Sequence, residues 1–120
     1  ISAISEIGLR IAIILLVGLA APIMEELAFR GVLLTVIRRR LTDRSAIAIS
    51  ALVFAVFHWA GVDQANVAAG LVTMVQLFLV GLALGHLTVK HGRLGPAIFL
   101  HAGFNMLTLI VLFFAPTALG

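Results

Sequence analysis

Charged and polar side chains interrupt the apolar stretches of this 120-residue chain. The groups that carry chemistry there are Glu25, Glu26, Arg30, His58, His86, His101 and Asn105. Ionisable groups inside a lipid-spanning segment are costly unless they face protein or water and find a partner, so they indicate a functional site. His86 lies one turn before Lys90 and is assigned to the membrane interface. The other six are the candidate site residues.

Spacing along a helix divides these residues into pairs. Glu26 and Arg30 are four residues apart, as are His101 and Asn105, so each pair shares one helix face. Glu25 lies about 100° around the helix from Glu26. One carboxylate can therefore face a cavity while the other meets Arg30.

Helix rise predicts a common depth for the candidates. Measured along the helix from the nearest basic loop, Glu25 and His58 lie about 21 Å away and Asn105 about 18 Å away. His101 is shallower, at about 12 Å, and a helix tilt of about 20° brings it within reach. We therefore expect one layer of polar groups.

Two chemistries fit this set of residue types. A buried carboxylate beside an imidazole can act as general base on a water, which suits hydrolysis, and His101 with Asn105 can donate hydrogen bonds to a developing oxyanion. Alternatively, Glu25, His58 and His101 can bind zinc or another divalent metal with one position open for water. No HExxH-type pair fixes two ligands on one turn, so the spacing leaves both open.

A non-enzymatic interpretation uses the same buried groups. They would then form a proton or ion relay, or serve structurally in an immunity or scaffold protein. A relay tolerates substitution of Asn105 better than a hydrolase whose oxyanion this residue stabilises.

Composition identifies the class of protein that holds these groups. The chain is 62% hydrophobic and 11% charged, whereas a soluble domain carries about 25% charged residues. This composition predicts an integral membrane protein whose surroundings are the lipid bilayer. The absence of cysteine excludes disulfides, thiol catalysis and a cysteine-ligated metal. The net charge is +3, and the basic residues that produce it cluster at the ends of apolar runs, as in membrane proteins. No nucleic-acid partner is therefore expected.

Uncharged stretches bounded by polar residues predict an all-α fold, a polytopic transmembrane helical bundle with four to five spans. The expected helical units are 4–40, 45–62, 66–89 and 94–115. The first would be about 55 Å long if continuous, so we expect either a bend at Pro22 or two helices that meet there.

The distribution of Lys and Arg predicts the orientation. Arg38–Arg44 forms one basic loop and Lys90–Arg93 forms another two spans later, so both are expected in the cytoplasm and 61–65 on the other side. We expect a multi-pass protein of a prokaryotic plasma membrane, and the sequence leaves its oligomeric state open.

Three motifs, in order and in separate apolar segments, resemble the CPBP family of intramembrane proteases. This family includes the type II CAAX prenyl proteases and the bacterial bacteriocin-processing and abortive-infection proteins. The motifs EExxxR, FxxxH and HxxxN occur here as Glu25-Glu26-x-x-x-Arg30, Phe54-x-x-x-His58 and His101-x-x-x-Asn105. The resemblance covers residues 20–109, within a single expected domain of 1–120 that lacks the additional spans family members usually carry before this core.

The resemblance implies an intramembrane endopeptidase acting on a membrane-associated protein or peptide, lipidated and of CAAX type in the eukaryotic case. It implies that Glu25 activates the attacking water and that His58 assists this base. Glu26 and Arg30 would hold the site together, and His101 and Asn105 would stabilise the oxyanion. The family has been described both as metal-dependent and as glutamate-dependent without metal, so zinc stays open.

Overall fold

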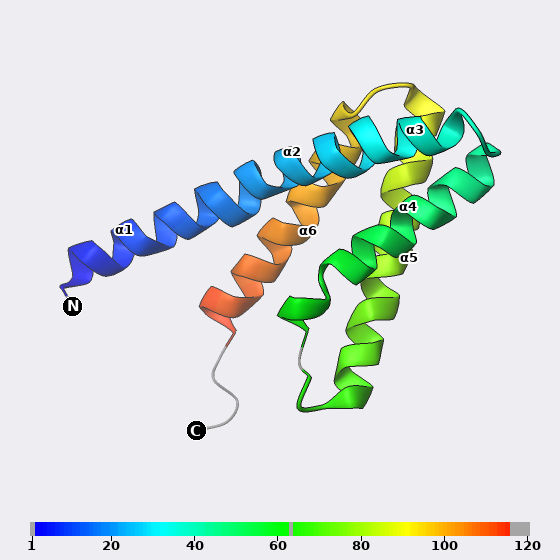
Figure 1. Ribbon diagram of the computed structural model, residues 1–120. Coiled ribbons are helices and arrows are strands. Elements are labelled where there is room, and N and C mark those ends of the chain that lie inside the picture. Colours follow the sequence, from blue (N-terminus) through cyan, green and yellow to red (C-terminus); the bar gives the residue numbers. More distant parts are fainter. Residues whose placement is uncertain (1, 63, 116–120) are drawn as a thin grey trace.

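The chain folds as a bundle of helices, as predicted (Figure 1). The structure is a computed structural model that describes residues 2–62 and 64–115. Within these ranges every regular element is helical. The chain runs along one long N-terminal helix, returns through a shorter one, and then forms two further long helices.

The N-terminal helix is continuous from Ala3 to Arg38, a length of 36 residues. It consists of α1 (Ala3–Ile13), α2 (Ala21–Glu26) and α3 (Leu34–Arg38), joined by the wider π-helical segments Ile14–Ala20 and Leu27–Leu33. Of the two alternatives for Pro22, separate helices that meet there are excluded, because one helix continues through the proline. The wider turns explain this continuity, because the Ala21 N–H donates to the Leu16 carbonyl five residues back, directly before the proline.

Helix α4 (Asp43–Phe57) is shorter than the predicted span 45–62. It begins at Thr42, whose hydroxyl accepts a hydrogen bond from the Ser45 N–H. It ends at His58, where a single 3₁₀ turn, Trp59–Gly61, follows. Its 15 residues cover about 22 Å.

The predicted polytopic helical bundle is confirmed, with four helices among the described residues. Among the described residues, three helices are long and apolar enough to cross a membrane: Ala3–Arg38, Val67–His91 and Gly95–Phe114. The fourth helix, α4, ends at His58 within the uncharged run 45–62 and is therefore shorter than the expected unit.

Helices α5 (Val67–His91) and α6 (Gly95–Phe114) lie close to the predicted limits. The Asn66 side chain caps the start of α5, and Gly92 ends it in a left-handed conformation with φ of 64°. Pro96 lies in the first turn of α6, where its missing N–H costs nothing.

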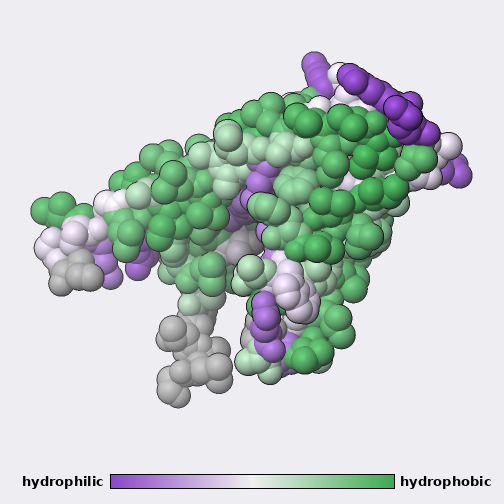
Figure 2. Space-filling model, viewed as in Figure 1, coloured by the Kyte–Doolittle hydropathy of each residue, from purple (hydrophilic) through white to green (hydrophobic). Residues whose placement is uncertain are grey.

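Small residues bring α4 and α5 together. A Cβ atom added to Gly81 would lie 3.0 Å from the Ala51 Cα, and one on Gly85 would lie 3.1 Å from the Ile47 side chain. The GxxxG step in α5 thus serves helix packing within the chain. Apolar residues cover most of the face seen in Figure 2, and hydrophilic residues gather at the turn between α3 and α4. This surface suits a lipid environment.

Candidate active site

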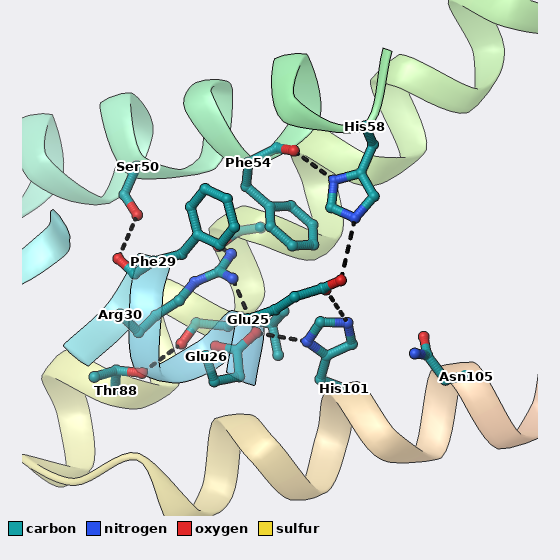
Figure 3. A network of polar contacts seen from close by, with 12 residues as sticks. Glu25, Glu26, Phe29, Arg30, Ser50, Phe54, His58, Thr88, His101 and Asn105 are labelled. Atoms are coloured by element: carbon teal, nitrogen blue, oxygen red, sulfur yellow. Dashed lines mark hydrogen bonds and ion pairs between the residues drawn. The ribbon is translucent and has the colours of Figure 1, made fainter. Parts of the chain in front are cut away.

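The candidate residues come from the long N-terminal helix, from α4 and from α6 (Figure 3). Glu25 and Glu26 lie at the end of α2, and Arg30 lies in the π-helical segment Leu27–Leu33 that follows. His58 caps the C-terminal end of α4, whereas His101 and Asn105 lie one turn apart on α6. The structure brings Glu25, Glu26, Arg30, His58 and His101 into one network and places Asn105 beside it.

Glu26 and Arg30 form a buried ion pair. The Arg30 Nη1 atom donates to the Glu26 Oε1 atom at 2.9 Å, and Nη2 donates to the Gly81 carbonyl at 3.2 Å. The guanidinium also lies over the Phe54 ring, 4.5 Å from its centroid. Arg30 therefore links the N-terminal helix to both α4 and α5.

The ion pair leaves some hydrogen-bonding capacity unused. Within the described part of the chain, Glu26 Oε2 and Arg30 Nε have no hydrogen-bond partner. A buried pair of this kind is weak evidence for net stability, but removal of one partner is costly because the other charge stays buried.

His101 lies between the two carboxylates. Its Nδ1 atom is 2.6 Å from Glu26 Oε1, and its Nε2 atom is 3.3 Å from Glu25 Oε2. An ionised Glu26, paired with Arg30, can only accept, so the His101 Nδ1–H donates to it. This bond fixes the imidazole with Nε2 directed at Glu25.

A backbone carbonyl orients His58 so that its Nε2 atom, like that of His101, is directed at Glu25. Its Nδ1 atom lies 2.6 Å from the Phe54 carbonyl. A carbonyl can only accept, so Nδ1 carries the hydrogen and Nε2 is directed at Glu25 Oε1, 3.7 Å away. The Phe54 ring supports this orientation, since its centroid is 4.5 Å from that of the imidazole.

Glu25 thus faces two imidazole nitrogens. In neutral imidazoles oriented in this way, each Nε2 directs a lone pair at Glu25, and the ionised carboxylate directs lone pairs back, so no hydrogen atom lies between them. Such an arrangement is stable when a proton sits on one of the three groups, or when a water donates hydrogen atoms to them. Glu25 is therefore placed to exchange protons with a water or an imidazole.

Asn105 is oriented by the N-terminal helix. Its Nδ2 atom donates to the Val17 carbonyl at 2.8 Å. The π-helical hydrogen bond from Ala21 reaches back five residues to Leu16, and the next donor in that register would be the nitrogen of Pro22. Proline has no N–H, so it cannot bond to Val17, and the Asn105 amide takes that carbonyl instead. The second Nδ2 hydrogen stays available.

The site residues open onto one cavity of about 850 Å³. Glu25, His58, His101 and Asn105 all line it. Its remaining walls come from the N-terminal helix, α4, α5 and α6 and are mainly apolar. Figure 2 shows hydrophilic atoms inside the hollow between the N-terminal helix and the helices α4 and α5. The cavity can hold a substrate segment of several residues beside the carboxylate.

Polar groups that the sequence analysis missed also line this cavity. Thr73 and Gln76 lie on α5, and Thr108 lies on α6 one turn after Asn105. A signal was present, because Thr73 and Gln76 are the polar side chains within the uncharged stretch 67–85. Both side chains are neutral and are not typical metal ligands, so the criterion that ionisable groups mark a site does not identify them.

Comparison with known proteins identifies the family. A family profile described as type II CAAX prenyl endopeptidase, Rce1-like, matches residues 7–107. The chain belongs to this family. No curated protein and no solved structure matches the chain. The CPBP resemblance is thereby confirmed, and with it an integral membrane protein of a CAAX-type endopeptidase family whose substrates are membrane-associated proteins.

The metal variant of the CAAX endopeptidase hypothesis finds no support in the side-chain arrangement. Among the described residues, no group of three His, Cys, Asp or Glu side chains is arranged to hold a metal ion. Glu25, His58 and His101 converge, but they meet as a carboxylate in contact with two imidazoles.

Proposed function

We propose that this chain hydrolyses a peptide bond of a membrane-associated, CAAX-type protein or peptide, with Glu25 as the general base. The observation that carries the proposal is the position of Glu25 on the cavity wall, 3.3 Å from His101 Nε2 and 3.7 Å from His58 Nε2. A carboxylate held between two oriented imidazoles can take a proton from a water at neutral pH.

The reaction begins with a water between Glu25 and His58. Glu25 takes one proton from this water, and the oxygen attacks the carbonyl carbon of the scissile bond. His58 accepts a hydrogen bond from the water at Nε2 and orients it. After the tetrahedral intermediate forms, Glu25 returns the proton to the leaving nitrogen, and the carbon–nitrogen bond breaks.

The oxyanion of this intermediate would be stabilised from α6. A protonated His101 donates from Nδ1 to Glu26 and from Nε2 to the oxyanion, while Asn105 supplies its second Nδ2 hydrogen. The Glu26 carboxylate stabilises the imidazolium charge at a distance of 2.6 Å. One well-placed donor of this type contributes a factor of about 10² to 10³ in kcat.

The test is cleavage of a fluorescent prenylated CAAX peptide by the purified full chain and by Glu25→Gln. Loss of a general base lowers kcat by about 10² to 10⁴, so Glu25→Gln should retain little activity while its melting temperature stays near that of the wild type. Glu6→Gln, which alters an exposed carboxylate on α1, serves as the matched control and should cleave normally.

Two outcomes contradict the proposal. If the folded wild type cleaves no prenylated or membrane-anchored peptide, the proposed hydrolase activity is wrong. If Glu25→Gln cleaves as fast as the wild type, the proposed role of Glu25 as general base is wrong. Loss of wild-type activity in a chelator, restored by zinc, would return the metal alternative.

A further inference from the structure

We propose that Gln76 binds the main chain of the substrate in the active-site cavity. This inference rests on the proposed function and adds to it the part of the substrate that is recognised. Gln76 lies outside the three sequence motifs, on α5, and lines the same cavity as Glu25 and His101.

The position of Gln76 within α5 is the first argument. Its helix is apolar along most of its length, yet Thr73 and Gln76 occur three residues apart, on one face, and both line the cavity. Gln76 lies about 21 Å of helix from Lys90, which matches the depth of Glu25 below its own basic loop. The Gln76 amide therefore lies at about the same depth in the membrane as Glu25.

The hydrogen-bonding state of Gln76 is the second argument. The Thr73 hydroxyl donates to the Ala69 carbonyl and the Thr108 hydroxyl donates to the Phe104 carbonyl, so both are partly satisfied within their own helices. The Gln76 side chain has no hydrogen bond to any other described residue. Gln76 is exposed and lines the cavity, so its carboxamide is accessible to a ligand there. A cavity that receives a polar ligand provides the missing partner.

The donor and acceptor groups of the Gln76 side chain indicate which ligand it can bind. One carboxamide offers a donor and an acceptor side by side, which matches the carbonyl and N–H of a peptide unit. Asn105 and Thr108 lie on the opposite wall, on α6, so polar groups are present on both sides of an otherwise apolar cavity. An extended peptide can pass between them, and recognition through its main chain leaves the side chain at that position free to vary.

The test uses the prenylated CAAX reporter peptide and analogues in which one backbone amide at a time is replaced by an ester. Loss of one hydrogen bond corresponds to about a five- to tenfold weaker interaction. Gln76→Leu should raise KM for the all-amide peptide by that factor and leave kcat within about twofold. In the wild type one ester position should show the same rise, and in Gln76→Leu that rise should disappear.

Two controls separate binding from folding. Val75→Leu changes the neighbouring exposed residue of α5, outside the cavity, and should leave KM unchanged. Gln76→Asn keeps the amide but shortens it, so its KM should lie between those of the wild type and Gln76→Leu. An unchanged KM in Gln76→Leu, or equal ester effects in both proteins, overturns the proposal.

A binding measurement distinguishes failure of this inference from failure of the hydrolase. The labelled peptide is titrated with folded Glu25→Gln and with Glu25→Gln/Gln76→Leu, and fluorescence anisotropy gives Kd. A five- to tenfold weaker Kd in the double variant supports Gln76 even where the wild type cleaves nothing. Equal Kd values overturn it whether or not cleavage occurs.

Discussion

Adjacent glutamates in this chain have different surroundings. Glu25 is partly exposed on the cavity wall between two imidazoles, whereas Glu26 is buried against Arg30. The offset of about 100° between successive helical residues separates them. His101 contacts both carboxylates, so the buried ion pair and the proposed reacting groups belong to one network.

The buried ion pair gives a prediction about stability. Arg30→Leu leaves Glu26 buried without its counter-charge, and such a change costs about 3–5 kcal/mol. The apparent melting temperature in detergent should fall sharply. In Arg30→Leu/Glu26→Gln much of this loss should be recovered, because no uncompensated charge remains.

An exposed ion pair provides the comparison. Arg38 contacts Asp43 at 2.7 Å, and their side chains are 39% and 53% exposed. Arg38→Leu should change stability by less than about 1 kcal/mol. Similar melting temperatures for Arg30→Leu and Arg38→Leu would contradict the role assigned to the buried pair.

Sequence spacing could predict the residue-scale arrangement only in part. The four-residue spacing predicted the Glu26–Arg30 contact, and three apolar segments at one depth predicted the convergence on Glu25. The Asn105 bond to Val17 depends on a π-helical register that periodicity does not reveal. Gln76 is neutral, so a criterion based on ionisable groups does not identify it.

The π-helical segments matter at the scale of elements. One precedes Pro22 and the other contains Arg30. The first leaves the Val17 carbonyl without a backbone donor, and Asn105 of α6 binds there. A feature of the N-terminal helix thus sets the direction of a proposed oxyanion donor on another helix.

Restoring the missing N–H should therefore reduce activity. In Pro22→Ala the new backbone donor can bond to Val17 and release the Asn105 side chain. We expect kcat to fall toward that of Asn105→Ala while the melting temperature does not fall, since a helix-interior proline has been removed. Peptide cleavage and thermal unfolding measure the two effects.

Pro96→Ala is the matched substitution for this test. Pro96 lies in the first turn of α6, where a backbone N–H would have no carbonyl acceptor within the helix. The kcat of Pro96→Ala should therefore equal that of the wild type. The idea also requires that Asn105→Ala cost less in the Pro22→Ala background than in the wild type. Strictly additive losses would refute it.

Element boundaries were predictable where capping residues mark them. Asn66 and Gly92 delimit α5, and Pro96 marks the start of α6. The end of α4 was not predictable from hydropathy, because His58 and Trp59 interrupt the helix without interrupting the uncharged run. The continuity of the N-terminal helix through Pro22 likewise required the wider π-helical turns.

The path of the helices through the membrane is the feature of the whole molecule that orients the site. The α3–α4 turn and the α5–α6 connection lie at the same end of the bundle, and the α4–α5 connection lies at the other (Figure 1). We propose that the basic loops Arg38–Arg44 and Lys90–Arg93 face the cytoplasm, since positive charge accumulates there.

Cysteine labelling tests this orientation, and the cysteine-free wild type serves as the blank. Leu41→Cys and His91→Cys should resist an impermeant maleimide in intact cells and react after lysis. Gln64→Cys should react in intact cells. Labelling of Leu41→Cys and Gln64→Cys from the same side would contradict the proposed topology.

The length of α4 has a consequence for the surrounding lipid. A hydrocarbon core is about 30 Å thick, and a segment that falls short of it draws the leaflets together or lets solvent penetrate beside its end. The end of α4 carries His58, next to Glu25. We therefore expect the bilayer to be thinner beside this end of α4, so that solvent can reach the site where the proposed hydrolysis consumes a water molecule.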